Sequence, residues 1–205
     1  NVTGMTVMTN AIASYGAEAV AAMGIAQKTT MIPCYIAMGV SQGVMPLIGY
    51  NFAARNARRM KEATLYTTKA SQAIMIAMTV LYFVFARQIV GLFMDNEQII
   101  EYGAAFMRGL SLAQPFLCMD FMAVGVFQAC GMGKRALLFA FLRKIVLEIP
   151  ALLLLNRLFP MYGLAYAQLV AEVVLATAAI LFLVKIFKDA QAMADRTAME
   201  NMVQE

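Results

Sequence analysis

"GVSQGVMPLIGYNFAARNARR", residues 39–59, is an apolar run that contains a glutamine and a proline and that ends among three arginines. The run begins upstream, near residue 19. It is long enough to cross the hydrocarbon layer of a bilayer, which takes about 20 apolar residues in a helix. Arginines that directly follow such a run are typical of the cytoplasmic end of a transmembrane helix. The stretch therefore predicts a membrane-spanning helix whose charged end lies in the cytoplasm.

The composition of the whole chain agrees with a membrane protein. Of its 205 residues, 62% are hydrophobic and only 14% are charged, whereas a soluble domain is about half apolar and about a quarter charged. No segment between the apolar runs is long enough to fold by itself. We therefore expect one integral membrane domain without a soluble catalytic module.

Six apolar segments divide the chain, and turn-forming residues or clustered charges separate them. They predict an all-α, polytopic bundle of about six transmembrane spans, at residues 1–14, 19–50, 64–86, 103–131, 136–158 and 163–187. The lobe formed by residues 1–187 is followed by residues 188–205, which we expect to form a polar cytoplasmic tail. The sequence starts at Asn1 within an apolar run and without an initiator methionine. We therefore expect a fragment whose first span is truncated.

The distribution of cations predicts the orientation of the bundle. If the breaks between six spans alternate sides, twelve of the 16 Lys and Arg residues, including Arg143 and Lys144, fall on one side. Lys and Arg concentrate on the cytoplasmic side of short loops, so this side and the C-terminus are expected in the cytoplasm. The net charge of +4 then needs no nucleic-acid partner, because these cations face the anionic headgroups of the lipid bilayer.

Three polar side chains recur at intervals of seven residues along the second span: Lys28, Tyr35 and Gln42. An interval of seven drifts by only about 20° on an ideal helix, so the three side chains share one face. This face has two interpretations. It is either a helix interface held by hydrogen bonds, with Lys28 reaching outward, or the wall of a cavity along a substrate and ion pathway.

The same span also contains small residues and a proline, at Gly39, Gly43, Pro46 and Gly49. Such residues allow close packing or bending, which suits a transporter whose helices rearrange. Ordinary packing between membrane helices uses small residues as well. They are thus compatible with transport without requiring it.

Acidic residues inside the spans are the candidates for ion binding. Asp120 lies deep in the fourth span and has no basic residue three or four positions away. It is a candidate proton or sodium site, and pairing with a cation on another helix is the structural alternative. Glu172, which shares a helix face with Gln168, is the second candidate. Glu148 is instead expected to pair with Lys144, which lies four residues earlier.

Enzymatic constellations are missing from the sequence. It contains no histidine, which excludes histidine metal sites and Ser-His triads. The string GMGK at 131–134 lacks the upstream glycine and the following Ser or Thr of a phosphate-binding loop. The three cysteines all lie in apolar runs, and an odd number so placed does not form a disulfide framework. We expect neither an enzyme nor a resident cofactor.

Two motifs resemble those of the multidrug and toxic compound extrusion (MATE) transporters. The first is similar to the family pattern G-x-x-Q-G-x-x-P-x-x-G-Y-N-x-G-A, which closes the eighth helix, and it is matched by Gly39, Gln42, Gly43, Pro46, Gly49, Tyr50, Asn51 and Ala54. Ala53 stands where the family usually has glycine, which predicts a less permissive turn. The second motif, FQACGMGKRALLFAFLRK at 127–144, is similar to the connection between the tenth and eleventh helices.

The resemblance implies that the chain is the C-terminal lobe of a twelve-helix transporter, containing helices seven to twelve. It implies a bacterial plasma (inner) membrane and a sodium- or proton-coupled antiporter that exports small amphipathic or cationic compounds. Its partners would be those organic substrates and the N-terminal lobe of the same protein. Asp120 falls close to where several members carry an acidic residue in helix ten. Two alternatives remain open: a lipid-linked sugar flippase of the same superfamily and a non-transporting membrane assembly subunit.

Overall fold

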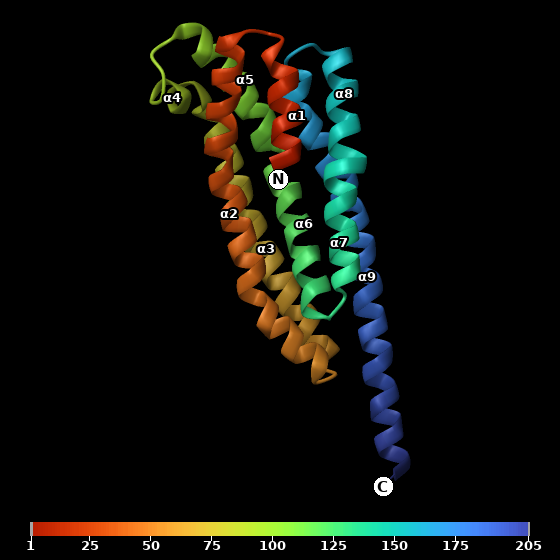
Figure 1. Cartoon of the computed structure of the whole chain (residues 1–205). Helices are drawn as coiled ribbons and strands as arrows, with labels where there is room; N and C mark the ends of the chain where they lie inside the picture. Colours follow the sequence, from red (N-terminus) through yellow and green to blue (C-terminus); the bar gives the residue numbers. More distant parts are fainter. Residues whose placement is uncertain (1, 205) are drawn as a thin grey trace.

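The computed structural model describes residues 2–204, with side chains from residue 6 onward, and Figure 1 shows an elongated bundle of helices. The described elements are all helical and are, in chain order, α1 (Val2–Ala13), α2 (Ala17–Ala53), α3 (Ala57–Val84), α4 (Ala86–Gly91), α5 (Glu97–Leu112), α6 (Gln114–Ala129), α7 (Gly133–Phe141), the π-helix η1 (Leu142–Glu148), α8 (Ile149–Leu158) and α9 (Gly163–Gln204). The predicted all-α class is confirmed. Asn1 and Glu205, the ends of the predicted first span and tail, lie outside the described residues.

The six predicted segments correspond to six helical rods, of which two are composite. The fourth consists of α5 and α6, which meet at a bend of 41°, and the fifth consists of α7, η1 and α8. Within residues 2–204, α2, α3 and α9 are each long and apolar enough to span a membrane, and α5 with α6 forms a fourth candidate. The fifth rod is divided by its π-helical turns into pieces that are each too short to qualify.

One predicted boundary is wrong. The third span is predicted to start at residue 64, but α3 already begins at Ala57, where the side chain of Asn56 accepts a hydrogen bond from the backbone N–H of Arg59. The polar tail is helical, since α9 continues without interruption to Gln204 and projects beyond the bundle (Figure 1). This extension is rich in Ala and Met and contains neither Gly nor Pro, so its residues favour the helix.

The turn after α2 also differs from its prediction. Ala53 is the last residue of the helix, and the left-handed conformation that favours glycine falls two residues later, on Arg55 (φ 57°). The N–H of Asn56 donates to the carbonyl of Asn51 (2.9 Å), and the N–H of Arg55 donates to the carbonyl of Phe52 (3.2 Å). Alanine therefore does not strain the turn at Ala53, because the position is helical.

The hydrophobic core forms two large clusters toward the two ends of the bundle. Along α5 and α6, the first cluster extends to Leu110 and the second begins at Met122. Along α9, the first cluster extends to Ala167 and the second begins at Leu175. A layer that belongs to neither large cluster therefore crosses the middle of the bundle.

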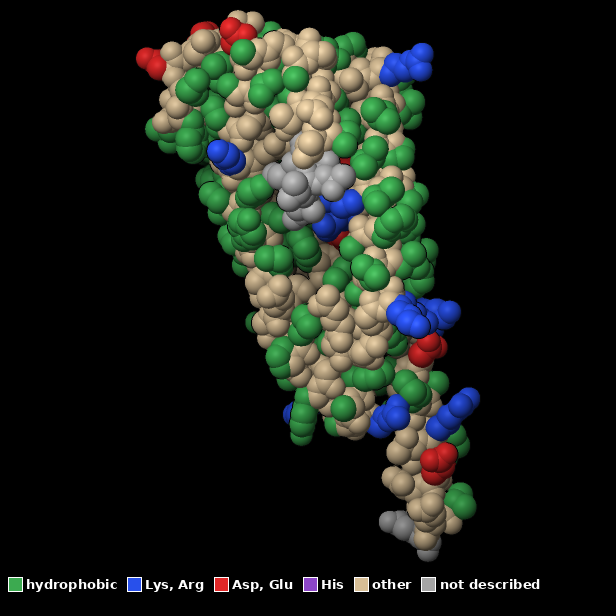
Figure 2. All heavy atoms as spheres, in the orientation of Figure 1, with side chains coloured by type: hydrophobic (Ala, Val, Ile, Leu, Met, Phe, Trp, Pro, Cys, Tyr) green, Lys and Arg blue, Asp and Glu red, His purple; other side chains and the backbone are tan. Residues whose placement is uncertain are grey.

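The outer surface is apolar along most of its length. Large hydrophobic side chains such as Ile76, Leu81, Leu154 and Leu181 are exposed on several different helices. Figure 2 shows hydrophobic side chains spread over the visible face, with Lys and Arg side chains near the end from which α9 projects. A soluble monomer rarely exposes so much contiguous apolar surface. The chain is an integral membrane protein, and an apolar surface of this kind suits contact with lipid.

Candidate functional site: a charged layer inside the bundle

The layer between the two large clusters contains five charged side chains, which we call the charged layer: Asp120 from α6, Arg143, Lys144 and Glu148 from η1, and Glu172 from α9. All three carboxylate residues are buried. The prediction placed Arg143 and Lys144 among the cations of one membrane side, and this is wrong. Both lie on η1 in the middle of the fifth rod, where α7 and α8 separate them from the loops at its two ends.

Asp120 has a partner in the charged layer. Its Oδ2 atom accepts a hydrogen bond from the Nη1 atom of Arg143 at 2.8 Å, and the two side chains are only 2% and 11% exposed. The Arg143 guanidinium also lies over the ring of Phe121, 5.2 Å from its centroid. The absence of a cation near Asp120 in the sequence therefore did not mean an isolated charge, because the cation comes from another helix.

The predicted pair of Lys144 and Glu148 is confirmed, with 2.6 Å between Nζ and Oε2. Both residues lie on the π-helical turns of η1, where the N–H of Ile149 donates to the carbonyl of Lys144, five residues earlier. Pro150 follows directly and cannot donate to the carbonyl four residues before it, so the regular α-helical ladder is interrupted here. Single π-helical turns occur frequently at functional sites.

Glu172 completes the charged layer from α9 and is 1% exposed. It interacts electrostatically with the other four members, Arg143 most strongly. Among the residues that the structure describes, four buried side-chain atoms have no hydrogen-bond partner: Oε1 of Gln114, Oδ1 of Asp120, Nε of Arg143 and Oε2 of Glu172. Buried polar atoms are normally paired, so these four mark a place where polar groups are under-satisfied.

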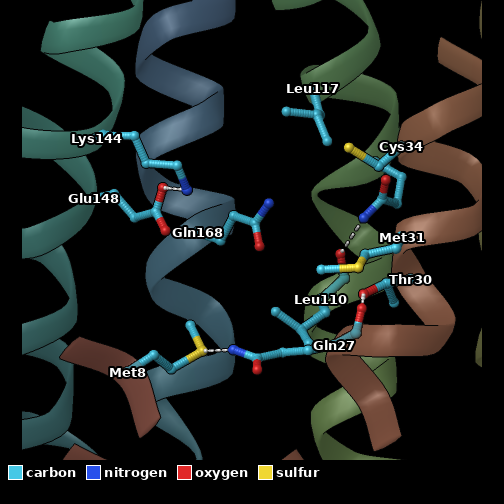
Figure 3. A pocket seen from close by; sticks show the side chains of 11 residues that line it. Met8, Gln27, Thr30, Met31, Cys34, Leu110, Leu117, Lys144, Glu148 and Gln168 are labelled. Carbon is cyan, nitrogen blue, oxygen red and sulfur yellow. Dashed lines mark hydrogen bonds and ion pairs between the residues drawn. The ribbon is translucent and has the colours of Figure 1, made fainter. Parts of the chain in front are cut away.

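A cavity of about 90 Å³ borders the charged layer (Figure 3). Lys144, Glu148 and Gln168 line one side, and Gln27, Thr30 and Cys34 from α2 line the other. This polar cavity has room for a few water molecules, each of which occupies about 30 Å³ in the liquid. It is too small for an organic compound of drug size, whose pockets measure at least about 300 Å³.

The three polar residues predicted to share a face of α2 are not part of this cavity. Lys28, Tyr35 and Gln42 are all exposed, Tyr35 by 61%, so the predicted common face exists and points out of the bundle. Lys28 lies in a separate surface groove beside Phe93 and Met94. The structure therefore separates the candidates into a buried group around Asp120 and an exposed face on α2.

Among the glycine and proline residues of the first motif, three lie on the surface and one packs against another helix. A Cβ added at Gly39 or Gly43 would meet no atom within 4 Å among the described residues, and Pro46 is exposed. Gly49 instead packs against the backbone carbonyl of Ala129 in α6, 3.2 Å from an ideal Cβ position.

Asn51 is buried at the end of the motif. Its side chain donates a hydrogen bond to the carbonyl of Leu47 at 2.8 Å, in the last turns of α2. Asn51 thus supports the end of the helix rather than contributing to the charged layer.

The charged layer does not resemble a preformed metal centre. Within the described part of the chain, no three side chains of His, Cys, Asp or Glu are arranged so that they could hold a metal ion together. The structure brings together Asp120, Glu172 and Gln168, which the sequence offered as separate candidates on two spans. The sequence did not indicate Arg143, whose only signal was its position in the interior of a predicted span.

Comparisons with known proteins agree with the fold and with both sequence motifs. The MatE family model matches residues 1–154. Multidrug export protein MepA from Staphylococcus aureus (strain N315) and MepA from Staphylococcus saprophyticus are each 34% identical over 171 residues. The alignment covers 83% of this chain and 37% of each relative, so the matched region spans well under half of their length.

Solved structures show the same fold. A multidrug resistance MATE family transporter in an outward-facing conformation superposes with a TM-score of 0.87 at 19% identity, covering 93% of this chain and 44% of that one. An inward-facing conformation of a MATE family transporter gives a TM-score of 0.86 at 20% identity, with the same coverage. The chain therefore belongs to the MATE family of membrane transporters.

Proposed function

We propose that this chain is one lobe of a multidrug exporter that a cation gradient drives, and that the charged layer is where the coupling cation binds. The relatives that support export are named multidrug export proteins. We propose that the substrates are small amphipathic or cationic organic compounds. The observation that supports a coupling site is that the charged layer contains more carboxyl groups than cationic groups.

The charge balance of the layer explains why a cation would bind there. Three carboxyl groups, on Asp120, Glu148 and Glu172, face two cationic groups, on Arg143 and Lys144. When all five are ionised, one negative charge remains without compensation, and a net charge inside a membrane is costly. One bound proton or one monovalent cation neutralises the layer.

The arrangement favours a proton over a sodium ion. A hard metal cation is held by several oxygen ligands at once, whereas a proton needs one basic atom. Glu172 offers such an atom, since its buried Oε2 has no hydrogen-bond partner among the described residues. We propose that water in the adjacent cavity delivers the proton to the charged layer, because Lys144 and Glu148 line this cavity and the side chain of Lys144 is 24% exposed.

The substrate would bind outside this lobe's interior, on the exposed face of α2. Lys28, Tyr35 and Gln42 lie there, and we propose that they face a cleft shared with an N-terminal lobe of the same protein. The two superposed structures support a lobe that moves as a unit, because this fold matches an outward-facing and an inward-facing conformation equally well. Rigid-body rocking of two halves is a common way to achieve alternating access.

Transport by the full-length protein in proteoliposomes tests the coupling site. Asp120→Asn leaves two carboxylates for two cations, so the layer is neutral without a bound proton. We expect this variant to insert normally and to lose efflux of ethidium driven by a pH gradient. Asp95→Asn is the matched control, because Asp95 is exposed in the loop between α4 and α5, outside the charged layer. Efflux by Asp120→Asn at the wild-type rate, under both proton and sodium gradients, would show that the carboxylate is structural.

A further inference from the structure

A second site lies at the end of the bundle from which α9 projects, in a surface groove between the first turns of α3 and the middle of α9, residues 184–191. The groove measures about 600 Å³ and is lined by Ala57, Arg58, Lys61, Glu62, Leu65, Val184, Phe187, Lys188 and Gln191. We propose that this groove binds one anionic phospholipid, such as phosphatidylglycerol. We call it the basic groove.

The charges of the basic groove favour an anion. Arg58, Lys61 and Lys188 are exposed there, and only Glu62 opposes them, through its ion pair with Arg58 at 2.9 Å. Two positive charges therefore remain without an acidic partner in the lining. Basic pockets between transmembrane helices are typical sites for anionic lipid headgroups.

The first turn of α3 adds to this preference. It contains two arginines and no acidic residue, although the positive end of the helix dipole at an N-terminus disfavours cations and favours anions. The side chain of Asn56 caps the backbone N–H of Arg59. A phosphate beside Arg58 would offset the repulsion between the cations and the helix end, and would accept hydrogen bonds from Arg58 and Lys61.

The order of polarity along the basic groove distinguishes a lipid from a free anion. On α3, Arg58 and Lys61 come first, and Leu65 follows toward the middle of the bundle. On α9, which runs in the opposite direction, Val184 precedes Lys188. Both helices therefore place cations at the outer end and exposed apolar side chains at the inner end. A phospholipid has the same order, with its phosphate outside and its acyl chains inside.

Native mass spectrometry of the full-length protein in detergent tests the basic groove. The protein is incubated with phosphatidylglycerol or with phosphatidylcholine of the same acyl chains, and the retained lipid is counted. We expect selective retention of phosphatidylglycerol, and roughly thirtyfold weaker retention by the double variant Lys61→Gln/Lys188→Gln, since each of the two cations near an anionic lipid contributes about 1 kcal/mol. The control Lys134→Gln/Arg135→Gln removes two exposed cations near the same end but outside the groove.

The control variant and a soluble competitor show whether the retention of phosphatidylglycerol depends on the basic groove. Wild-type retention by the control variant supports the groove, whereas an equal loss in both double variants would show a general surface-charge effect and overturn the proposal. An excess of glycerol 3-phosphate should not displace the lipid, because it lacks the acyl chains that contact Leu65 and Val184. Complete displacement by this competitor, or equal retention of phosphatidylcholine, would also overturn it.

Discussion

Arg55 and Gly131 occupy the same position in two turns at the same end of the bundle. After α6, the N–H of Met132 donates to the carbonyl of Phe127 (2.7 Å), and the N–H of Gly131 donates to that of Gln128 (3.0 Å). This is the same pair of bonds that closes α2, and it defines a Schellman motif. The left-handed residue is Gly131 (φ 74°) in one turn and Arg55 (φ 57°) in the other.

The two turns predict opposite effects on stability. Arg55→Gly relieves the steric cost of a left-handed side chain, about 1 kcal/mol, and should raise the thermal unfolding temperature of the purified protein. Gly131→Ala introduces the same cost and should lower it. Both changes are read in one thermal unfolding assay in detergent. A lower unfolding temperature for Arg55→Gly would mean that the contact of Arg55 with the sulfur of Met193, at 3.0 Å, outweighs the backbone effect.

At the scale of elements, α2 and α6 cross closely in the middle of the bundle. The hydroxyl of Ser41 donates to the carbonyl of Phe121 at 2.7 Å. An ideal Cβ on Gly125 would lie 2.3 Å from the Oγ atom of Ser41. The absence of a side chain at Gly125 therefore lets the two helices meet and the hydrogen bond form.

This crossing predicts that Gly125→Ala destabilises the protein by about 2 kcal/mol, in the usual range for overpacking. Gly24→Ala in α2 is the control, because a Cβ there meets no atom within 4 Å among the described residues and alanine favours the helix. Thermal unfolding of both variants gives the comparison. Equal unfolding temperatures would contradict the close packing of α2 on α6.

The sequence predicted the helices better than their ends. The apolar runs are long, so α2 and α9 were recognisable from composition alone. Clustered charge at 55–62 suggested a loop, but Arg58 and Lys61 are compatible with the first turns of a helix once Asn56 caps it. Local charge does not reveal whether a residue follows a cap.

At the scale of the whole molecule, the sequence indicated the acidic members of the charged layer and the local pair of Lys144 with Glu148, but not the pairing of Asp120 with Arg143. Asp120 and Glu172 were expected to be special because each is acidic inside a span. The ion pair of Asp120 with Arg143 joins residues 23 positions apart on different rods, and only the packing of those rods brings them together. The exposed face with Lys28 followed from its seven-residue period, which local helix geometry determines.

The orientation of the bundle gives a prediction at this scale. The turn at Asn56 and the end of α9 at Gln204 are expected in the cytoplasm, because cations gather at that end. Asn56→Cys and Gln204→Cys, in a background without the native cysteines, should resist an impermeant thiol reagent in intact cells. Asp95→Cys, in the exposed loop between α4 and α5, should react. Labelling of Asn56→Cys from outside would reverse the orientation.

Measurement of the ion gradient that balances substrate flux tests the coupling site most directly. Proteoliposomes with the full-length protein receive a fixed gradient of a cationic substrate, and the opposing pH gradient is varied until net flux is zero. For the wild type, we predict that some opposing pH gradient stops the net flux. Glu172→Gln removes the excess negative charge of the layer, so we expect its substrate to flow down the substrate gradient at every pH gradient tested. Zero net flux in Glu172→Gln at the same pH gradient as in the wild type would contradict the proposal that the charged layer binds the coupling cation.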